Sequence, residues 1–183
     1  AIGDNIRMLR SRLPTGTRLM VMVKALAYGT DDTLMAKFLE TCGVDILGVS
    51  YVDEGVALRR AGAAQSIFVI NAAPYEADKV VKWDLEIGVS DKETAEAVAL
   101  AASKAGKQVR THLHINTGMG RFGCRMEDAL RLALLIKNTP QLIFEGIMTH
   151  FACADDPSQD PFTLRQSELF DKVISALEQE GID

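Results

Sequence analysis

A lysine stands at the end of an apolar run near the start of the chain. Residues 19–23 read Leu-Met-Val-Met-Val, Lys24 ends the run, and Tyr28 and Gly29 come soon after. Such a run is typical of a buried strand, which holds the side chain at its end in a fixed place. An amine at the rim of an apolar core can act as a nucleophile, because burial favours its neutral form. Lys24 is therefore a candidate for Schiff-base chemistry, with a solvated lysine at a strand end as the alternative.

The second candidate group surrounds Arg121. Residues 109–116 read as a strand, whose alternation places His112 and His114 on one face and apolar residues on the other. The following loop, 117–123, holds three glycines around Arg121, so its backbone can approach a ligand closely. Arg121 could bind a carboxylate through two parallel hydrogen bonds. A ligand would help to offset the entropy of ordering this loop, which favours a functional Arg121, whereas His112 is better explained as a structural residue.

A histidine also follows the last predicted strand, at position 150. His150 could act as a general base, stack on a ring or bind a metal, and a structural histidine is the commonest alternative. No second His or Cys near it forms a familiar zinc motif, so we expect no metal. The cysteines Cys42, Cys124 and Cys153 are far apart and without a CxxC pair, which argues against a disulfide framework and fits a reducing cytoplasm.

The elements that carry these residues alternate along the chain. After a first helix, a strand and a helix follow one another six times, which is typical of an α/β protein with a parallel sheet. The predicted strands are 19–24, 45–49, 67–70, 85–89, 109–116 and 142–149. The predicted helices are 2–13, 31–42, 53–61, 74–82, 91–105, 126–137 and 161–180.

Two architectures fit this alternation, a doubly wound open sheet and a (β/α) barrel of the TIM type. No GxGxxG follows a strand, which removes the best support for a dinucleotide-binding sheet. Six strands are too few to close an eight-stranded barrel, so a barrel would be incomplete, with about six of eight βα units. In both architectures the carboxyl ends of the strands meet at one edge, where we expect Lys24, Arg121 and His150.

Composition excludes several classes of protein. The chain has 183 residues, 48% of them hydrophobic and 25% charged, which is ordinary for one globular domain. A net charge of −5 without a basic block argues against a nucleic-acid partner. No apolar run approaches the roughly 20 residues of a membrane span, so we expect no membrane partner.

Three segments taken together resemble the alanine racemase family. They are Val23-Lys24-Ala25 with Ala27-Tyr28-Gly29, then Asn116-Thr117-Gly118-Met119-Gly120-Arg121-Phe122-Gly123, then Met148-Thr149-His150-Phe151-Ala152. Their order and separation are similar to those of the family's N-terminal barrel, over essentially the whole chain. The resemblance implies a cytoplasmic, homodimeric isomerase that uses pyridoxal 5'-phosphate to interconvert L-alanine and D-alanine, supplying D-alanine for peptidoglycan.

The resemblance also implies roles for individual residues. Lys24 matches the Schiff-base lysine, which is one of two catalytic bases. Tyr28 matches the tyrosine that reaches the cofactor phosphate, and His150 matches the histidine that packs against the pyridine ring. Arg121 matches the arginine near the ring hydroxyl and the substrate carboxylate. Met119, in the same motif, is expected to contact the substrate.

Two residues depart from the family's pattern. The family often has a lysine, sometimes carbamylated, where this chain has His114, and an aspartate where it has Asn116. The modified lysine helps to hold the arginine in the family. Arg121 must therefore be held by other means, or by His114 itself.

The resemblance covers only part of the family's architecture. Residues 1–183 match the N-terminal part of the barrel domain, and the family's C-terminal β-rich domain, which carries the opposing tyrosine base, is absent. We therefore expect a fragment of a longer enzyme that is inactive alone. Two alternatives stay open: a non-catalytic barrel domain that binds pyridoxal phosphate, and a racemase or decarboxylase of another amino acid.

Overall fold

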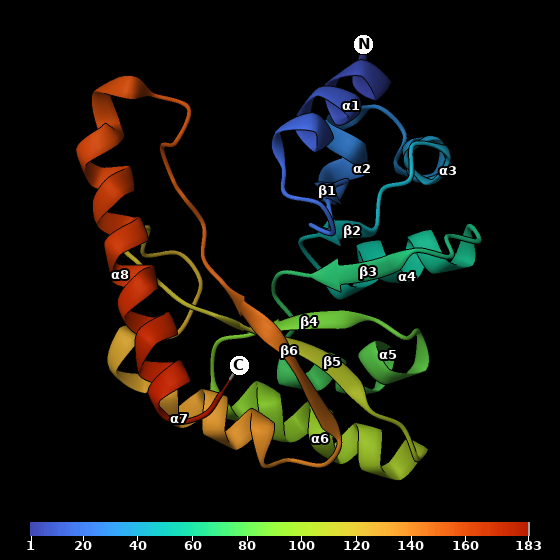
Figure 1. Ribbon diagram of the computed structural model, residues 1–183. Coiled ribbons are helices and arrows are strands. Elements are labelled where there is room, and N and C mark those ends of the chain that lie inside the picture. The colour runs from blue at the N-terminus through green and yellow to red at the C-terminus, as the bar shows by residue number, and fades with distance from the viewer. Residues whose placement is uncertain (183) are drawn as a thin grey trace.

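A curved sheet of parallel strands, with helices along its outer face, makes up the computed structural model, which describes residues 1–182 (Figure 1). The six strands follow one another in chain order from β1 to β6. They are β1 (Met20–Met22), β2 (Ile46–Val49), β3 (Ser66–Val69), β4 (Glu86–Val89), β5 (Val109–His114) and β6 (Leu142–Met148). A doubly wound sheet would reverse its strand order at a switch point, so this order excludes it and confirms the incomplete (β/α) barrel.

Helices connect the strands and cover the outer face. They are α1 (Ile2–Arg12), α2 (Lys24–Gly29), α3 (Asp32–Thr41), α4 (Val52–Arg60), α5 (Ala77–Lys82), α6 (Lys92–Ala105), α7 (Met126–Lys137) and α8 (Asp160–Gln179), with the short 3-10 helices η1 (Pro74–Glu76) and η2 (Pro157–Gln159). The predicted elements are all present, with ends within two residues, where the predicted helix 74–82 corresponds to η1 followed by α5. The sequence patterns did not predict α2 and η2. α1 stands at the β1 end of the sheet and α8 at the β6 end (Figure 1).

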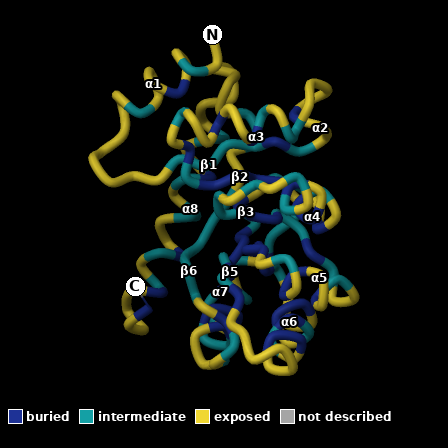
Figure 2. The backbone as a smooth tube through the Cα atoms, turned by 90° about the vertical axis from the view of Figure 1, so that its right-hand side faces the viewer, coloured by how far each residue is buried: buried dark blue, intermediate teal, exposed yellow. Residues whose placement is uncertain are grey.

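The hydrophobic core lies between the sheet and the helices. Every second strand residue points outward into it, as in Leu47, Ile67, Ile87 and Leu113, all fully buried. The facing helix residues include Leu39, Leu58, Val80, Val98 and Ile136. Figure 2 shows the resulting pattern, with buried backbone along β2 to β5 and mostly exposed backbone in α1. Each such side chain contributes roughly 1.5–3 kcal/mol by leaving water.

The inner face of the sheet carries a polar cluster. The Glu86 carboxylate accepts a hydrogen bond from Arg110 Nε at 2.7 Å and lies 3.3 Å from His112 Nε2. Burial raises the pKa of Glu86, but hydrogen bonds from His112, Ser66 and Arg110 outweigh it and lower the pKa to about 2. The His112 ring also packs edge-on against Phe68, with centroids 5.0 Å apart. These contacts support the structural interpretation of His112.

One ion pair connects the two edge strands of the sheet. Arg18, just before β1, forms an ion pair of 3.0 Å with Glu145 in β6. Glu145 is an extra residue in β6, because Thr111 pairs with Phe144 whereas His112 pairs with Gly146.

Within residues 1–182, none of the helices is both long and apolar enough to cross a membrane.

Candidate active site

The side chains singled out by the sequence meet at the carboxyl ends of the strands. Lys24 follows β1, Arg121 lies in the loop after β5, and His150 lies two residues beyond β6. Arg121, His114 and His150 line one small cavity at these strand ends. The structure therefore brings Arg121 and both histidines together, and Lys24 stands at the same edge of the sheet.

Lys24 opens an unusual turn rather than ending a strand as predicted. The four residues Ala25–Tyr28 have φ between 50° and 57° and ψ between 40° and 51°, a left-handed helical turn. For residues other than glycine this conformation costs about 1–2 kcal/mol each. Strain of this kind persists only where surrounding contacts fix it, and such positions concentrate at functional sites.

Two long-range hydrogen bonds fix this turn. The buried Val23 donates its N–H to the carbonyl of Gly48 at 2.8 Å, near the carboxyl end of β2. Ala25 donates its N–H to Glu54 Oε1 at 2.8 Å, and the other carboxylate oxygen of Glu54 accepts from the N–H of Ser50 at 2.8 Å. Glu54, at the start of α4, therefore anchors the Lys24 turn to the β2–α4 loop. The sequence did not predict a role for Glu54, because no local pattern marks it.

Tyr28 lies at the rim of this group. Its side chain is 66% exposed, and its ring centroid is 6.0 Å from Lys24 Nζ. This places the phenol beside the lysine and open to solvent, on the same edge of the sheet.

The Arg121 loop is shaped by Asn116. Asn116 Oδ1 accepts hydrogen bonds from the N–H groups of Gly118 and Gly120, both at 3.0 Å. Gly123 has φ +99°, and a Cβ on it would lie 2.6 Å from Asn116 N, so only glycine fits there. Arg121 itself lies over the Phe122 ring, with Cζ 5.3 Å from the centroid. This cation–π contact with Phe122 is one interaction that holds the Arg121 side chain.

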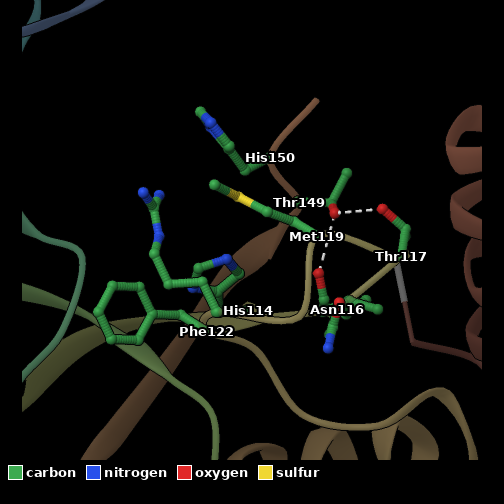
Figure 3. A pocket seen from close by; sticks show the side chains of 9 residues that line it. His114, Asn116, Thr117, Met119, Phe122, Thr149 and His150 are labelled. Carbon is green, nitrogen blue, oxygen red and sulfur yellow. Dashed lines mark hydrogen bonds between the residues drawn. The ribbon is translucent and has the colours of Figure 1, made fainter. Parts of the chain in front are cut away.

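His114 is buried behind the loop. It is 3% exposed, and its Nδ1 atom has no hydrogen-bond partner within residues 1–182. Burial is the main reason that the pKa of His114 falls to about 4, with smaller contributions from His150 and Arg121. His114 lines a small cavity together with Met119, Phe122 and His150, and Figure 3 shows Met119 and His150 extending to the same side of it. A neutral imidazole thus lines the site.

The electrostatic character of the site is positive. The pKa of His150 is lowered first by its partial burial and then by Arg121 and Lys24. Cations around weakly solvated histidines favour an anionic ligand such as a phosphate or a carboxylate. In the described part of the chain, no group of His, Cys, Asp and Glu side chains could hold a metal ion.

Known proteins match the chain along its whole length. A family model described as "Alanine racemase, N-terminal domain" matches residues 1–183. The chain is 34% identical over 182 residues to "Alanine racemase 1" of Oceanobacillus iheyensis, covering 99% of this chain and 48% of that protein. It is 36% identical over 171 residues to the alanine racemase of Geobacillus kaustophilus, covering 92% of this chain and 44% of that protein.

Solved structures agree with these matches. The alanine racemase of Clostridium difficile 630 in complex with cycloserine superposes with a TM-score of 0.91 at 27% identity, over 98% of this chain and 51% of that one. The alanine racemase from D-cycloserine producing Streptomyces lavendulae gives 0.91 at 31% identity, over 100% of this chain and 48% of that one. The chain spans about half the length of the curated relatives it matches. With the family model matching from end to end, the chain belongs to the alanine racemase family, as a member of its N-terminal domain.

Proposed function

We propose that this chain is the N-terminal part of the barrel domain of a pyridoxal-phosphate-dependent alanine racemase. The observation that carries the proposal is geometric: Arg121 and His150 line one cavity, at the edge of the sheet where Lys24 follows β1. The relatives named alanine racemase support the same reaction, the interconversion of L-alanine and D-alanine. The homodimer, the cytoplasmic location and the supply of D-alanine for peptidoglycan belong to this proposal.

The residues present fit pyridoxal phosphate. The Lys24 amine would hold the cofactor covalently, Tyr28 would contact its phosphate, and His150 would pack against its ring. Both the cofactor phosphate and the substrate carboxylate are anions, which suits the positive surroundings of His150. When bound, the cofactor supplies an electron sink for the charge that develops on the substrate Cα.

The chain's own residues would divide the remaining work. Arg121 would orient the substrate carboxylate, and Met119 would contact the substrate beside His150. The Lys24 amine would carry a proton to or from Cα on one face of the substrate. Racemisation needs a second proton carrier on the opposite face, because the two enantiomers differ in the face that is protonated.

Borohydride reduction of the protein that carries this chain, loaded with pyridoxal phosphate, tests the proposal. We expect mass spectrometry to find the reduced cofactor on the peptide that holds Lys24, and L-alanine to be converted to D-alanine. The Lys24→Ala variant should lose both. Lys37→Ala, which removes an exposed lysine on α3, should keep both and serves as the control.

Each other outcome has a distinct meaning. Absence of an adduct in the unaltered protein contradicts the proposal. An adduct without conversion of alanine leaves a pyridoxal-phosphate-binding domain or an enzyme acting on another amino acid, which an assay across other amino acids would then separate.

A further inference from the structure

One polar side chain outside the predicted site is completely buried beneath it. Gln166, in the second turn of α8, is 0% exposed. Its Nε2 donates to the carbonyl of His150 at 2.9 Å and to Thr117 Oγ1 at 3.1 Å. Its Oε1 accepts from the N–H of Ala152 at 3.2 Å. All three bonds go to the two loops that hold Arg121 and His150.

The pair of bonds to segment 150–152 imitates a strand. In a parallel sheet, one residue bonds to the carbonyl and the N–H of residues two apart on the neighbouring strand. The amide of Gln166 makes the same two bonds, to the His150 carbonyl and the Ala152 N–H. It thereby fixes the segment between β6 and the turn that begins at Ala152, where no strand residue pairs with it within residues 1–182.

The third bond belongs to a series of hydrogen bonds between hydroxyl groups, and the direction of each bond in the series can be assigned. Thr149 Oγ1 donates its hydrogen to the carbonyl of Ile115 at 2.9 Å, so it can only accept from Thr117 Oγ1, 2.8 Å away (Figure 3). Thr117 therefore donates to Thr149 and accepts from Gln166. Each hydrogen atom in this series of hydrogen bonds is donated once. Reversing any of the bonds would leave a buried donor without an acceptor.

This series of hydrogen bonds connects the Arg121 loop with the His150 segment. Thr117 stands directly before the Gly118–Arg121 segment, whose two glycine N–H groups bind Asn116. The ring of Phe162, one turn before Gln166 in α8, packs against Gly118. A Cβ added to Gly118 would lie 3.3 Å from this ring. The start of α8 therefore packs against the root of the Arg121 loop as well as the His150 segment.

We propose that Gln166 is a positioning residue that fixes His150 relative to Arg121, and so aligns the ring contact with the carboxylate contact. The inference rests on the proposed function. A displacement of about 1 Å between groups that orient a substrate can cost on the order of 100-fold in rate. Gln166 has no contact with the reacting atoms itself, and it acts only through the two loops.

Two variants of nearly equal size test this role in the protein that carries the chain. Gln166→Met removes all three bonds. Gln166→Glu keeps an acceptor for Ala152 but places a carboxylate oxygen against the His150 carbonyl. The control is Gln65→Met, which removes one hydrogen bond of 3.1 Å to the Ala36 carbonyl from a half-buried glutamine just before β3.

Hydrogen exchange and spectroscopy give readouts that a loss of stability alone would not move. Relative to the core amide of Leu113, exchange at the Ala152 N–H should quicken at least tenfold in Gln166→Met, which removes its acceptor, an order-of-magnitude expectation for a lost bond. Exchange at the Gly120 N–H, which bonds to Asn116, should quicken in both Gln166 variants because both lose the bond that holds Thr117. The absorption band of bound pyridoxal phosphate should shift, and kcat should fall by about 10- to 100-fold. The Gln65→Met control should match the unaltered protein in all three.

Two results overturn the inference. One is unchanged relative exchange at Gly120 in both Gln166 variants. The other is an active variant in which exchange quickens but kcat and the absorption band stay at the level of the control. If the unaltered protein binds no cofactor, the proposed function fails instead, and the exchange rates still decide whether Gln166 couples the two loops.

Discussion

Replacing Ala25 by glycine should stabilise the protein, the opposite of the usual effect of glycine in a helix. Ala25 has φ 52° and ψ 50°, and its side chain is exposed. Glycine removes a left-handed penalty of about 1–2 kcal/mol and adds a backbone entropy cost of about 0.5–1 kcal/mol. The hydrogen bond from the Ala25 N–H to Glu54 is kept, because it involves the backbone. The net gain is therefore about 0.5–1 kcal/mol.

A matched control isolates the effect of the turn. Ala57 is exposed in the middle of the right-handed helix α4, where glycine should destabilise the protein by about 1 kcal/mol. The entropy cost of glycine is common to both variants, so the difference between them reports the left-handed penalty alone. Urea unfolding should place Ala25→Gly about 1–2 kcal/mol above Ala57→Gly, which corresponds to a difference in Tm of roughly 2–8 °C.

Ala27 supplies a second check on the magnitude. It has the same left-handed geometry but is only 7% exposed, so glycine there also loses a buried methyl group worth about 0.8 kcal/mol. The two terms nearly cancel, and Ala27→Gly should change stability little. If Ala25→Gly and Ala57→Gly destabilise the protein equally, the left-handed turn does not exist in solution and the reasoning is refuted.

Three further predictions concern the sheet and the loop. Glu86→Gln should lower stability at pH 7 by about 1.5–3 kcal/mol by weakening its bond to Arg110, measured by urea unfolding. Because the pKa of Glu86 is about 2 rather than 4.5, the unaltered protein should lose this stability as pH falls from about 4.5 towards 2, and the variant should not. The pKa of His114 is about 4 rather than 6.5, so the unfolded state binds more protons between these values, and stability should fall as pH drops through that window. His114→Gln should flatten this part of the curve, and an unchanged slope would contradict the burial argument. Gly123→Ala should destabilise by about 2–5 kcal/mol through strain and a clash with backbone, whereas Gly62→Ala, with a similar φ and open space, should cost about 1–2 kcal/mol; equal thermal shifts for the two would argue against the tight loop.

Much of the fold follows from patterns that are local in sequence. Alternation of strand and helix periods predicts a parallel sheet, and the connections in such a sheet bring the carboxyl ends of all strands to one edge. For this reason the order of the elements is enough to predict that Lys24, Arg121 and His150 lie at the same edge. The alternation in β5 likewise predicts that His112 and His114 face inward while Leu113 enters the core, as observed.

Residue patterns alone leave two architectures open; the resemblance favours the barrel, and the tertiary structure decides it. A barrel and a doubly wound sheet share the same alternation, and they differ in which strands are neighbours. Strand order is decided by how the helices pack on the faces of the sheet, which the residue pattern of any single element does not contain. The observed order from β1 to β6 decides it.

The details that shape the site are also tertiary, for a common physical reason. The left-handed turn after Lys24 is built from alanine, leucine and tyrosine, which do not favour it, and it is held by Glu54, 29 residues away. Gln166 reaches Thr117 across 49 residues. Local propensity and periodicity report only on neighbours along the chain. The sequence by itself determined which groups gather at the edge of the sheet, and long-range hydrogen bonds made by buried polar side chains decided how those groups are held.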